Sequence, residues 1–186
     1  DLIDREIQAS TADRPGIIMA KVNSLQDKGV CKALYKASQA GVNIKLNVRG
    51  ICCLRPGVKG LSENIEVRSI VDRFLEHARV FYFRNAGHSE LYLGSADWMV
   101  RNLDRRLELL FPVKNERLRQ RLFDILSVFF NDNTQAQVLN SDGTYSPVER
   151  TGPKIRAQEA FYTAIKEANQ SAQNQSLRFR PISKTI

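Results

Sequence analysis

Residues 17–48 read IIMAKVNSLQDKGVCKALYKASQAGVNIKLNV, and this stretch decides the fold class. Ile17–Val22 is a nearly continuous apolar run, which is typical of a strand covered on both faces. In residues 27–40 apolar side chains recur at helical spacing, and Gly41 suits the position after a helix. Val42–Val48 alternates apolar and polar residues, as a strand does. Strand, helix and strand in this order predict a right-handed βαβ unit with parallel pairing.

Further elements are expected on both sides of this unit. They are a helix at 1–9, a helix at 62–76 leading to His77, antiparallel strands at 79–84 and 90–93, a strand at 107–111, an amphipathic helix at 115–131, an edge strand at 135–139 and a last helix at 154–168. This order predicts an α/β domain with a mixed β-sheet flanked by helices. We expect residues 1–170 to form the domain and residues 171–186, which are rich in Gln, Asn and Ser, to be a flexible tail.

Composition limits the partners. The 186 residues carry a formal net charge of +8, which favours polyphosphate, nucleotides, nucleic acid or an acidic membrane surface. The alternative is a basic surface that serves only solubility. No apolar run is long enough for a membrane-spanning helix, and no signal peptide is visible. Because the chain begins at Asp1 inside a predicted helix, we expect it to be a piece of a longer protein.

The three cysteines point away from disulfide, zinc and redox chemistry. Cys52 and Cys53 are adjacent, and Cys31 makes the count odd. The spacing fits neither zinc ligation nor a Cys-x-x-Cys redox motif. We expect buried thiols in a reducing compartment.

The densest chemistry lies in residues 77–106. His77 can exchange a proton near neutral pH, and Arg79 lies two residues later, on the same face if a strand begins here. A Gly94–Ser95 turn would let backbone N–H groups approach a phosphate, with the Ser95 hydroxyl added. Asp97 could orient a histidine or arginine; the alternative is that Ser95 or Asp97 only caps the following segment. Arg101 adds a cation that suits phosphate oxygens.

Arg49 is singled out by its place after a predicted parallel strand. Ligands of such sheets bind beyond the carboxyl ends of the strands. A surface ion pair is the alternative for Arg49. His88 stands at a predicted hairpin tip, where we expect it to be solvated and inert. No Walker-type loop and no carboxylate cluster with metal-ligand spacing is present in the sequence.

Several long blocks of the chain, in the right order, resemble the C-terminal catalytic domain of polyphosphate kinase, the larger bacterial type that makes polyphosphate from ATP. The resemblance runs from Asp1 to about Ala168. The blocks that carry it are residues 48–50 with the cysteine that follows shortly after, 60–65, 68–73, 75–77, 95–99 and 101–106.

The resemblance implies a phospholipase-D-like half, one of two that each supply a histidine to a shared site. His77 would be the histidine of the second half, while the phosphorylated histidine belongs to a preceding domain that is absent here. Arg49 and His77 would hold the phosphates of ATP, with Arg79, Ser95 and Arg101 in support. The family's Mg²⁺ site lies upstream, so Mg²⁺ would enter with ATP.

The departures from a phospholipase D signature are specific. Arg79 replaces the lysine of His-x-Lys, Arg84 stands where an aspartate would be, and Asp97 replaces the asparagine of Gly-Ser-x-Asn. The chain is therefore expected to serve phosphoryl transfer, with this fragment alone inactive. A phosphodiesterase or nuclease half-site and a non-catalytic polyanion-binding module are the alternatives.

The expected partners are ATP or ADP, polyphosphate, the upstream domains of the same chain and further copies of the intact enzyme, with no specific nucleic acid. The expected location is the cytoplasm, with peripheral attachment to the inner membrane left open.

Overall fold

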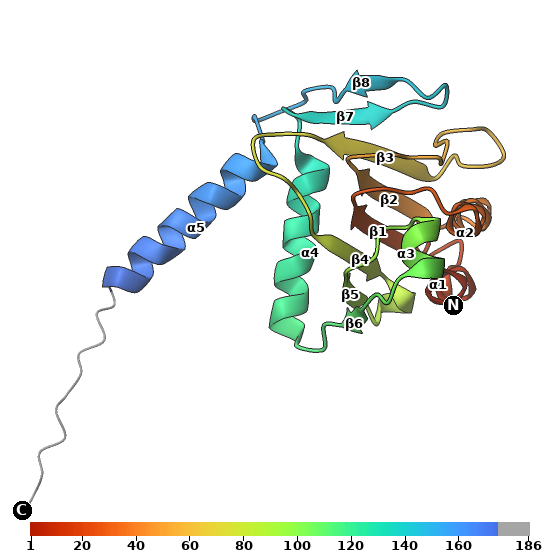
Figure 1. Ribbon diagram of the computed structural model, residues 1–186, viewed down its shortest axis with the longest axis horizontal. Helices are drawn as coiled ribbons and strands as arrows, with labels where there is room; N and C mark the ends of the chain where they lie inside the picture. The colour runs from red at the N-terminus through yellow and green to blue at the C-terminus, as the bar shows by residue number, and fades with distance from the viewer. Residues whose placement is uncertain (175–186) are drawn as a thin grey trace, which may run out of the picture.

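The computed structural model describes the backbone of residues 1–174 as one mixed β-sheet with helices on both faces (Figure 1). The strand order is β6-β5-β4-β1-β2-β3-β7-β8. The strands are β1 (Ile17–Val22), β2 (Asn43–Val48), β3 (Ile65–Ile70), β4 (Arg79–Phe83), β5 (Glu90–Gly94), β6 (Leu110–Pro112), β7 (Ala136–Leu139) and β8 (Tyr145–Pro147). Strands β1, β2 and β3 are parallel, and the other pairings are antiparallel.

Helices cover both faces of the sheet. Helices α1 (Leu2–Ala9) and α2 (Lys28–Gln39) pack on one face, and α4 (Glu116–Asn131) crosses the opposite face (Figure 1). The short α3 (Val100–Arg105) follows β5, and the 3-10 turn η1 (Asn85–Gly87) joins β4 to β5. Helix α5 (Ala157–Asn174) leaves the body (Figure 1). Residues 175–186 lie outside the described residues, so only the first residues of the expected tail are seen, and they continue α5.

The predicted βαβ unit is confirmed. Asp27 caps α2 by accepting from the backbone N–H of Val30 at 2.8 Å, and Gly41 ends the connection with a φ of +82° that favours glycine. The strands β1 and β2 pair in parallel from Ile17 opposite Asn43 to Val22 opposite Val48. Apolar side chains of both strands fill the core beneath α1 and α2, and Ile17 and Met19 of β1 face a second core beneath α4.

The prediction of a helix at residues 62–76 is wrong. Ile65–Ile70 forms β3, a third parallel strand beside β2, and residues 71–78 connect it to β4 without regular structure. Ile65 and Val67 are 4% and 0% exposed, so the apolar side chains recur with the period of two that a strand requires. The polar start of this segment and its scattered apolar residues are compatible with a helix as well as with a strand. Pairing with β2 selects the strand.

Two smaller predictions need correction. The strand predicted at 107–111 pairs only as Leu110–Pro112, and the Leu107 side chain is fully exposed. The strand predicted at 135–139 is not at the edge, because β8 pairs outside β7. Both errors concern pairing partners, which local sequence does not specify.

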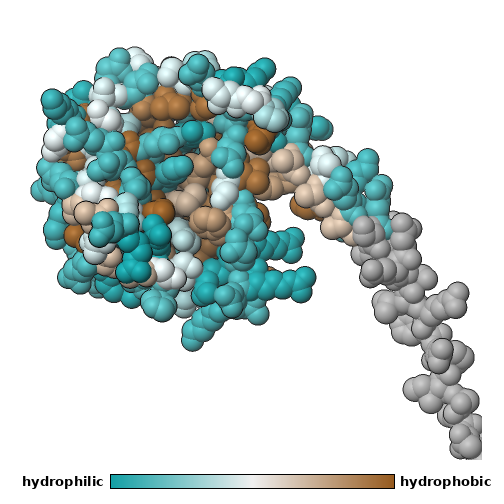
Figure 2. All heavy atoms as spheres, turned by 180° about the vertical axis from the view of Figure 1, so that it is seen from behind, coloured by the Kyte–Doolittle hydropathy of each residue, from teal (hydrophilic) through white to brown (hydrophobic). Residues whose placement is uncertain are grey.

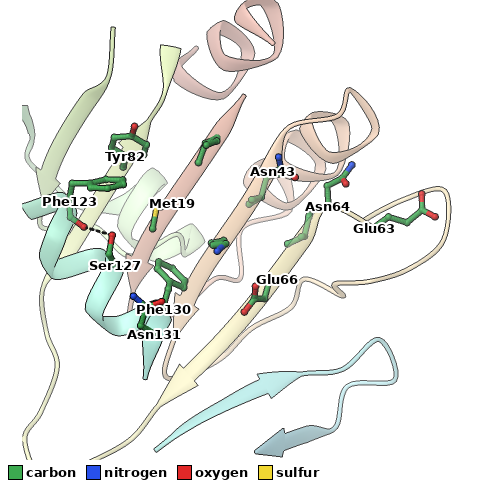
Figure 3. A pocket seen from close by; sticks show the side chains of 14 residues that line it. Met19, Asn43, Glu63, Asn64, Glu66, Tyr82, Phe123, Ser127, Phe130 and Asn131 are labelled. Atoms are coloured by element: carbon green, nitrogen blue, oxygen red, sulfur yellow. Dashed lines mark hydrogen bonds between the residues drawn. The ribbon is translucent and has the colours of Figure 1, made fainter. Parts of the chain in front are cut away.

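Apart from the predicted site, two surface features stand out. A hollow of about 580 Å³ lies between α4 and the strands β1 to β3, with Met19, Tyr82 and Phe123 on one side and Asn64 and Glu66 on the other (Figure 3). Figure 2 shows hydrophobic surface where α5 leaves the body. The large apolar side chains exposed on the β3–β4 connection and on α5 are Val71, Phe74, Leu75, Tyr162 and Ile165.

Candidate functional site at the carboxyl edge of the sheet

All of the site residues predicted from the sequence line one cavity of about 650 Å³. They are Arg49, His77, Arg79, Ser95 and Arg101. The cavity is completed by Asn23, Gly94, Asp97, Asn102, Arg106 and Glu108. The structure therefore brings together side chains that are far apart in the sequence, from Asn23 to Glu108.

The topology explains this convergence. Strands β1 and β2 are parallel, so Asn23 and Arg49, which directly follow them, leave the same edge of the sheet. Strand β4 is antiparallel to β1 and begins at this edge, just after His77. Strand β5 reverses again and ends there, just before Ser95. The site thus lies at the carboxyl edge of the parallel strands, where ligands of open α/β sheets bind.

Arg79 and Asp97 form the fixed centre of the site. The Arg79 Nη2 lies 2.8 Å from the Asp97 Oδ2, and both side chains are about nine-tenths buried. Asp97 also accepts from the backbone N–H of Asn23 at 2.7 Å. Burial opposes the charged form of Asp97, but hydrogen bonds from Arg79 and Asn23 outweigh it and keep the Asp97 pKa below its usual value. Asp97 orients an arginine, as one of its two predicted roles requires, and α3 has no side-chain cap.

His77 is exposed and rests against the Arg79 guanidinium. The Nη1 of Arg79 lies 3.1 Å from the His77 Nδ1 and donates to the His77 carbonyl at 3.0 Å. The Nη2 of Arg79 also lies 3.4 Å from the His77 Nε2, so the guanidinium lies against both ring nitrogens. The imidazole is therefore oriented by a side chain that is itself fixed by Asp97.

Arg49 forms no ion pair with any residue of the described part of the chain. Its Nε donates to the Asn23 Oδ1 at 2.8 Å and to the Glu76 carbonyl at 2.7 Å. Both partners are neutral, so the positive charge is not cancelled by a carboxylate. Its terminal nitrogens form no hydrogen bond with another residue in the described part of the chain. They can meet the oxygens of an anion in the cavity.

Ser95 has a local role in the structure. Its hydroxyl donates to Glu108 and accepts from the backbone N–H of Leu109 at 2.9 Å. Asn102 donates to the same carboxylate at 2.6 Å, and these hydrogen bonds lower the Glu108 pKa. Arg101 and Arg106 are exposed at the mouth of the cavity.

Sequence reasoning missed several side chains of this edge, among them Asn23, Glu76 and Glu108. Asn23 follows β1 as Arg49 follows β2, so the same rule about strand ends could have found it. Glu76 and Glu108 lie in connections whose positions depend on tertiary packing, and no local pattern marks them.

Other predictions concern residues away from the cavity. His88 is exposed at the end of η1, as expected. All three cysteines are free, and burial raises the pKa of Cys31 to about 11. Cys53 is exposed, so the prediction of buried thiols is wrong for this residue: Cys52 is bridged to Leu25 and packs against the core, and the next side chain of an extended backbone points to the other side. Within residues 1–174, no three His, Cys, Asp or Glu side chains are grouped to hold a metal ion.

A family model described as polyphosphate kinase C-terminal domain 2 matches residues 1–158. The chain belongs to this family. It is 57% identical over 152 residues to a polyphosphate kinase of Pseudomonas aeruginosa, covering 82% of this chain and 22% of that protein. It is 54% identical over 170 residues to a polyphosphate kinase of Rhodopirellula baltica, covering 90% of this chain and 20% of that protein. The domain thus spans about a fifth of the length of these relatives.

Solved structures agree on the fold. The polyphosphate kinase of Porphyromonas gingivalis superposes with a TM-score of 0.86 at 42% identity, covering 91% of this chain and 26% of that one. Nuc of Salmonella typhimurium, a phospholipase D family member, superposes with a TM-score of 0.55 at 17% identity, covering 75% of this chain and 90% of that one. The phospholipase-D-like fold of the domain is therefore confirmed. No helix in the described part of the chain is long and apolar enough to cross a membrane.

Proposed function

We propose that this domain forms part of a polyphosphate kinase that reversibly transfers the terminal phosphoryl group of ATP to polyphosphate. The observation that carries the proposal is the cavity in which Arg49, His77, Arg79 and Arg101 meet at the carboxyl edge of the sheet. Arginine charge and a histidine next to open space suit the binding and transfer of phosphoryl groups. Membership of the family adds the identity of the reaction.

The transfer takes place in two steps. First the γ-phosphoryl group leaves ATP as a P–O bond breaks, and a P–N bond forms to a histidine supplied by another part of the enzyme, with ADP released. Then the terminal oxygen of polyphosphate takes the phosphoryl group as the P–N bond breaks. His77 donates a hydrogen bond or proton near the transferring group, and Arg49 neutralises charge that develops on its oxygens.

The arginines of the cavity differ in what they can do. Arg79 is committed to Asp97 and orients His77, so its contribution to phosphate binding is indirect. Arg49 and Arg101 carry charge that no described carboxylate cancels by an ion pair, and they are the better phosphate ligands. Ser95 reaches a phosphate only if its hydroxyl leaves Glu108.

The cavity does not fit a magnesium site of its own. Asp97 is bound by Arg79 and by backbone N–H groups, and Glu108 is bound by Ser95 and Asn102. Neither carboxylate is free to coordinate a hard cation. We propose that Mg²⁺ accompanies the nucleotide and finds its protein ligands outside this domain.

The proposal includes partners and a location. The relatives are four to five times longer, and apolar side chains of Leu107, Leu109 and Phe111 are exposed beside the site. Upstream domains of the same chain would complete the site there. We further propose self-association of the intact enzyme and a cytoplasmic location, with attachment to the inner membrane left to experiment.

Polyphosphate binding tests the proposal directly. Calorimetry would compare long-chain polyphosphate with single-stranded DNA of equal charge, for the wild-type chain, Arg49→Ala and the control Arg14→Ala. Arg14 is exposed before β1, at the opposite edge of the sheet. We expect polyphosphate to be preferred, and Arg49→Ala to weaken its binding about tenfold, as loss of a charged hydrogen bond predicts, while Arg14→Ala does not.

Equal affinity for both polyanions, with equal effects of the two substitutions, would instead indicate a module that binds by net charge alone. Hydrolysis of a chromogenic phosphodiester that is lost in His77→Ala would indicate a phosphodiesterase half-site. Polyphosphate synthesis from ATP by this domain alone would contradict the need for a second histidine from elsewhere.

A further inference from the structure

The backbone that carries His77 is held by three cationic side chains. The Glu76 carbonyl accepts from the Arg49 Nε at 2.7 Å, and the His77 carbonyl accepts from the Arg79 Nη1 at 3.0 Å. The Ala78 carbonyl accepts from the Lys21 Nζ at 3.3 Å. Arg49 and Arg79 already belong to the cavity, but Lys21 does not line it.

Lys21 is buried beneath the site. It is 1% exposed and lies on β1, two residues after Met19, which faces the hollow beside α4 (Figure 3). Its Nζ lies 3.6 Å from the Glu76 Oε2 and 5.0 Å from the centroid of the Phe129 ring. Burial lowers the Lys21 pKa, and Glu76 opposes this. Burying an ammonium is costly, so its partners must hold a defined geometry.

Glu76 links this lysine to α5. Its Oε1 accepts from the Gln158 Nε2 at 3.1 Å, while the same amide group binds the backbone N–H and carbonyl of Phe74 at 2.8 Å each. The connection from β3 to β4 is irregular, so without these contacts nothing regular would fix residues 74–78. The carboxylate of Glu76 thus joins β1 and α5 immediately before His77.

We propose that Lys21 is a positioning residue of this site, which together with Glu76 fixes the backbone of residues 76–78 and thereby the place of the His77 imidazole beside Arg79. Lys21 acts through this backbone and touches no substrate. The structural part of the proposal is independent of the reaction, and its catalytic consequence rests on the proposed function.

Two variants of the same type test this role. Lys21→Met removes the ammonium and keeps most of the side-chain volume. Lys45→Met is the control, because Lys45 stands on the neighbouring strand opposite Met19, is exposed and, among the described residues, forms no hydrogen bond or ion pair with residues 76–78. Lys21→Met leaves Glu76 without its cation. If for that reason the single variant does not fold, the double variant Lys21→Met with Glu76→Gln, which removes both charges, is measured in its place.

The chain contains two histidines, so its imidazole NMR signals separate His77 from the distant reference His88. We expect Lys21→Met, or the double variant, to shift the His77 signals and leave those of His88 in place, with Lys45→Met changing neither. In the intact enzyme we expect kcat to fall about tenfold, as displacement of a catalytic group predicts, with a smaller change in KM for ATP.

Unchanged His77 signals in a folded Lys21 variant would overturn the proposal. So would a fall in kcat equal to that of Lys45→Met in an active enzyme. If the intact wild-type enzyme makes no polyphosphate, the proposed function fails, and the NMR comparison still decides the role of Lys21.

Discussion

Asp97 is the residue that holds the site together. It joins the end of β1, through the backbone N–H of Asn23 at 2.7 Å, to the start of β4, through Arg79 at 2.8 Å. Removing its charge would leave the Arg79 guanidinium buried without a counter-ion. Because Arg79 orients His77, a change at Asp97 would reach the imidazole without touching it.

The lowered Asp97 pKa predicts a pH dependence of stability. The stabilisation from ionised Asp97 is fully present above the unfolded-state pKa of about 3.9 and is lost as the pH falls through the lower folded-state pKa. We expect Asp97→Asn to cost about 3 kcal/mol of unfolding free energy at pH 7. This difference from wild type should shrink towards acidic pH.

Urea unfolding from pH 7 to pH 2 measures the effect, with Asp104→Asn as the control because Asp104 is exposed on α3. A difference between wild type and Asp97→Asn that stays constant over this range would contradict the assignment.

At the scale of the elements, Asp132 joins three of them. It is 0% exposed and follows α4. Its Oδ1 accepts from the backbone N–H groups of Thr134, Gln135 and Ala136, at the start of β7, and its Oδ2 accepts from the first N–H of α5, that of Ala157, at 2.7 Å. The carboxylate thereby sets the direction in which α5 leaves the body and places Gln158 near Glu76.

We expect Asp132→Ala to lower the unfolding free energy by about 3 kcal/mol or more, because several buried N–H groups lose their acceptor. Asn115→Ala removes the cap at the other end of α4, which accepts from Leu118 at 3.0 Å, and should cost about 1 kcal/mol. Denaturant unfolding of both variants gives the comparison. Equal losses would mean that Asp132 acts only as a helix cap.

At the scale of the whole molecule, the contribution of net charge to polyanion binding can be separated from that of the cavity. The net charge of +8 attracts any polyanion, whereas the cavity concentrates a few arginines at one edge of the sheet. Binding of polyphosphate should therefore weaken with salt, with the logarithm of affinity falling linearly with the logarithm of salt concentration.

Arg49→Ala should reduce this slope by about one, because one phosphate contact and its released counter-ion are lost. Arg14→Ala should leave the slope unchanged. Calorimetric titrations at several salt concentrations provide both slopes, and equal slopes for the two variants would remove Arg49 from the binding site.

The strands and the helix of residues 17–48 can be predicted from local sequence alone. Burial of β1 and β2 follows from the local apolar periodicity, and the start of α2 follows from the local hydrogen bond to Asp27. Arg49 was found because a βαβ unit fixes which edge its second strand reaches. Residues 62–76 were misread because their apolar residues fit two periods, and only the pairing of β3 with β2 selects one.

The sequence by itself determined the α/β class, the βαβ unit and the residue types of the candidate site, since these depend on period, capping and chemistry within short stretches. Only the tertiary structure decided that Asp97 binds Arg79, that Glu108 binds Ser95 and that Lys21 is buried beneath His77. The physical reason is that these contacts join segments far apart in the chain. Their geometry is set by strand order and by packing of the connections, which no local pattern encodes.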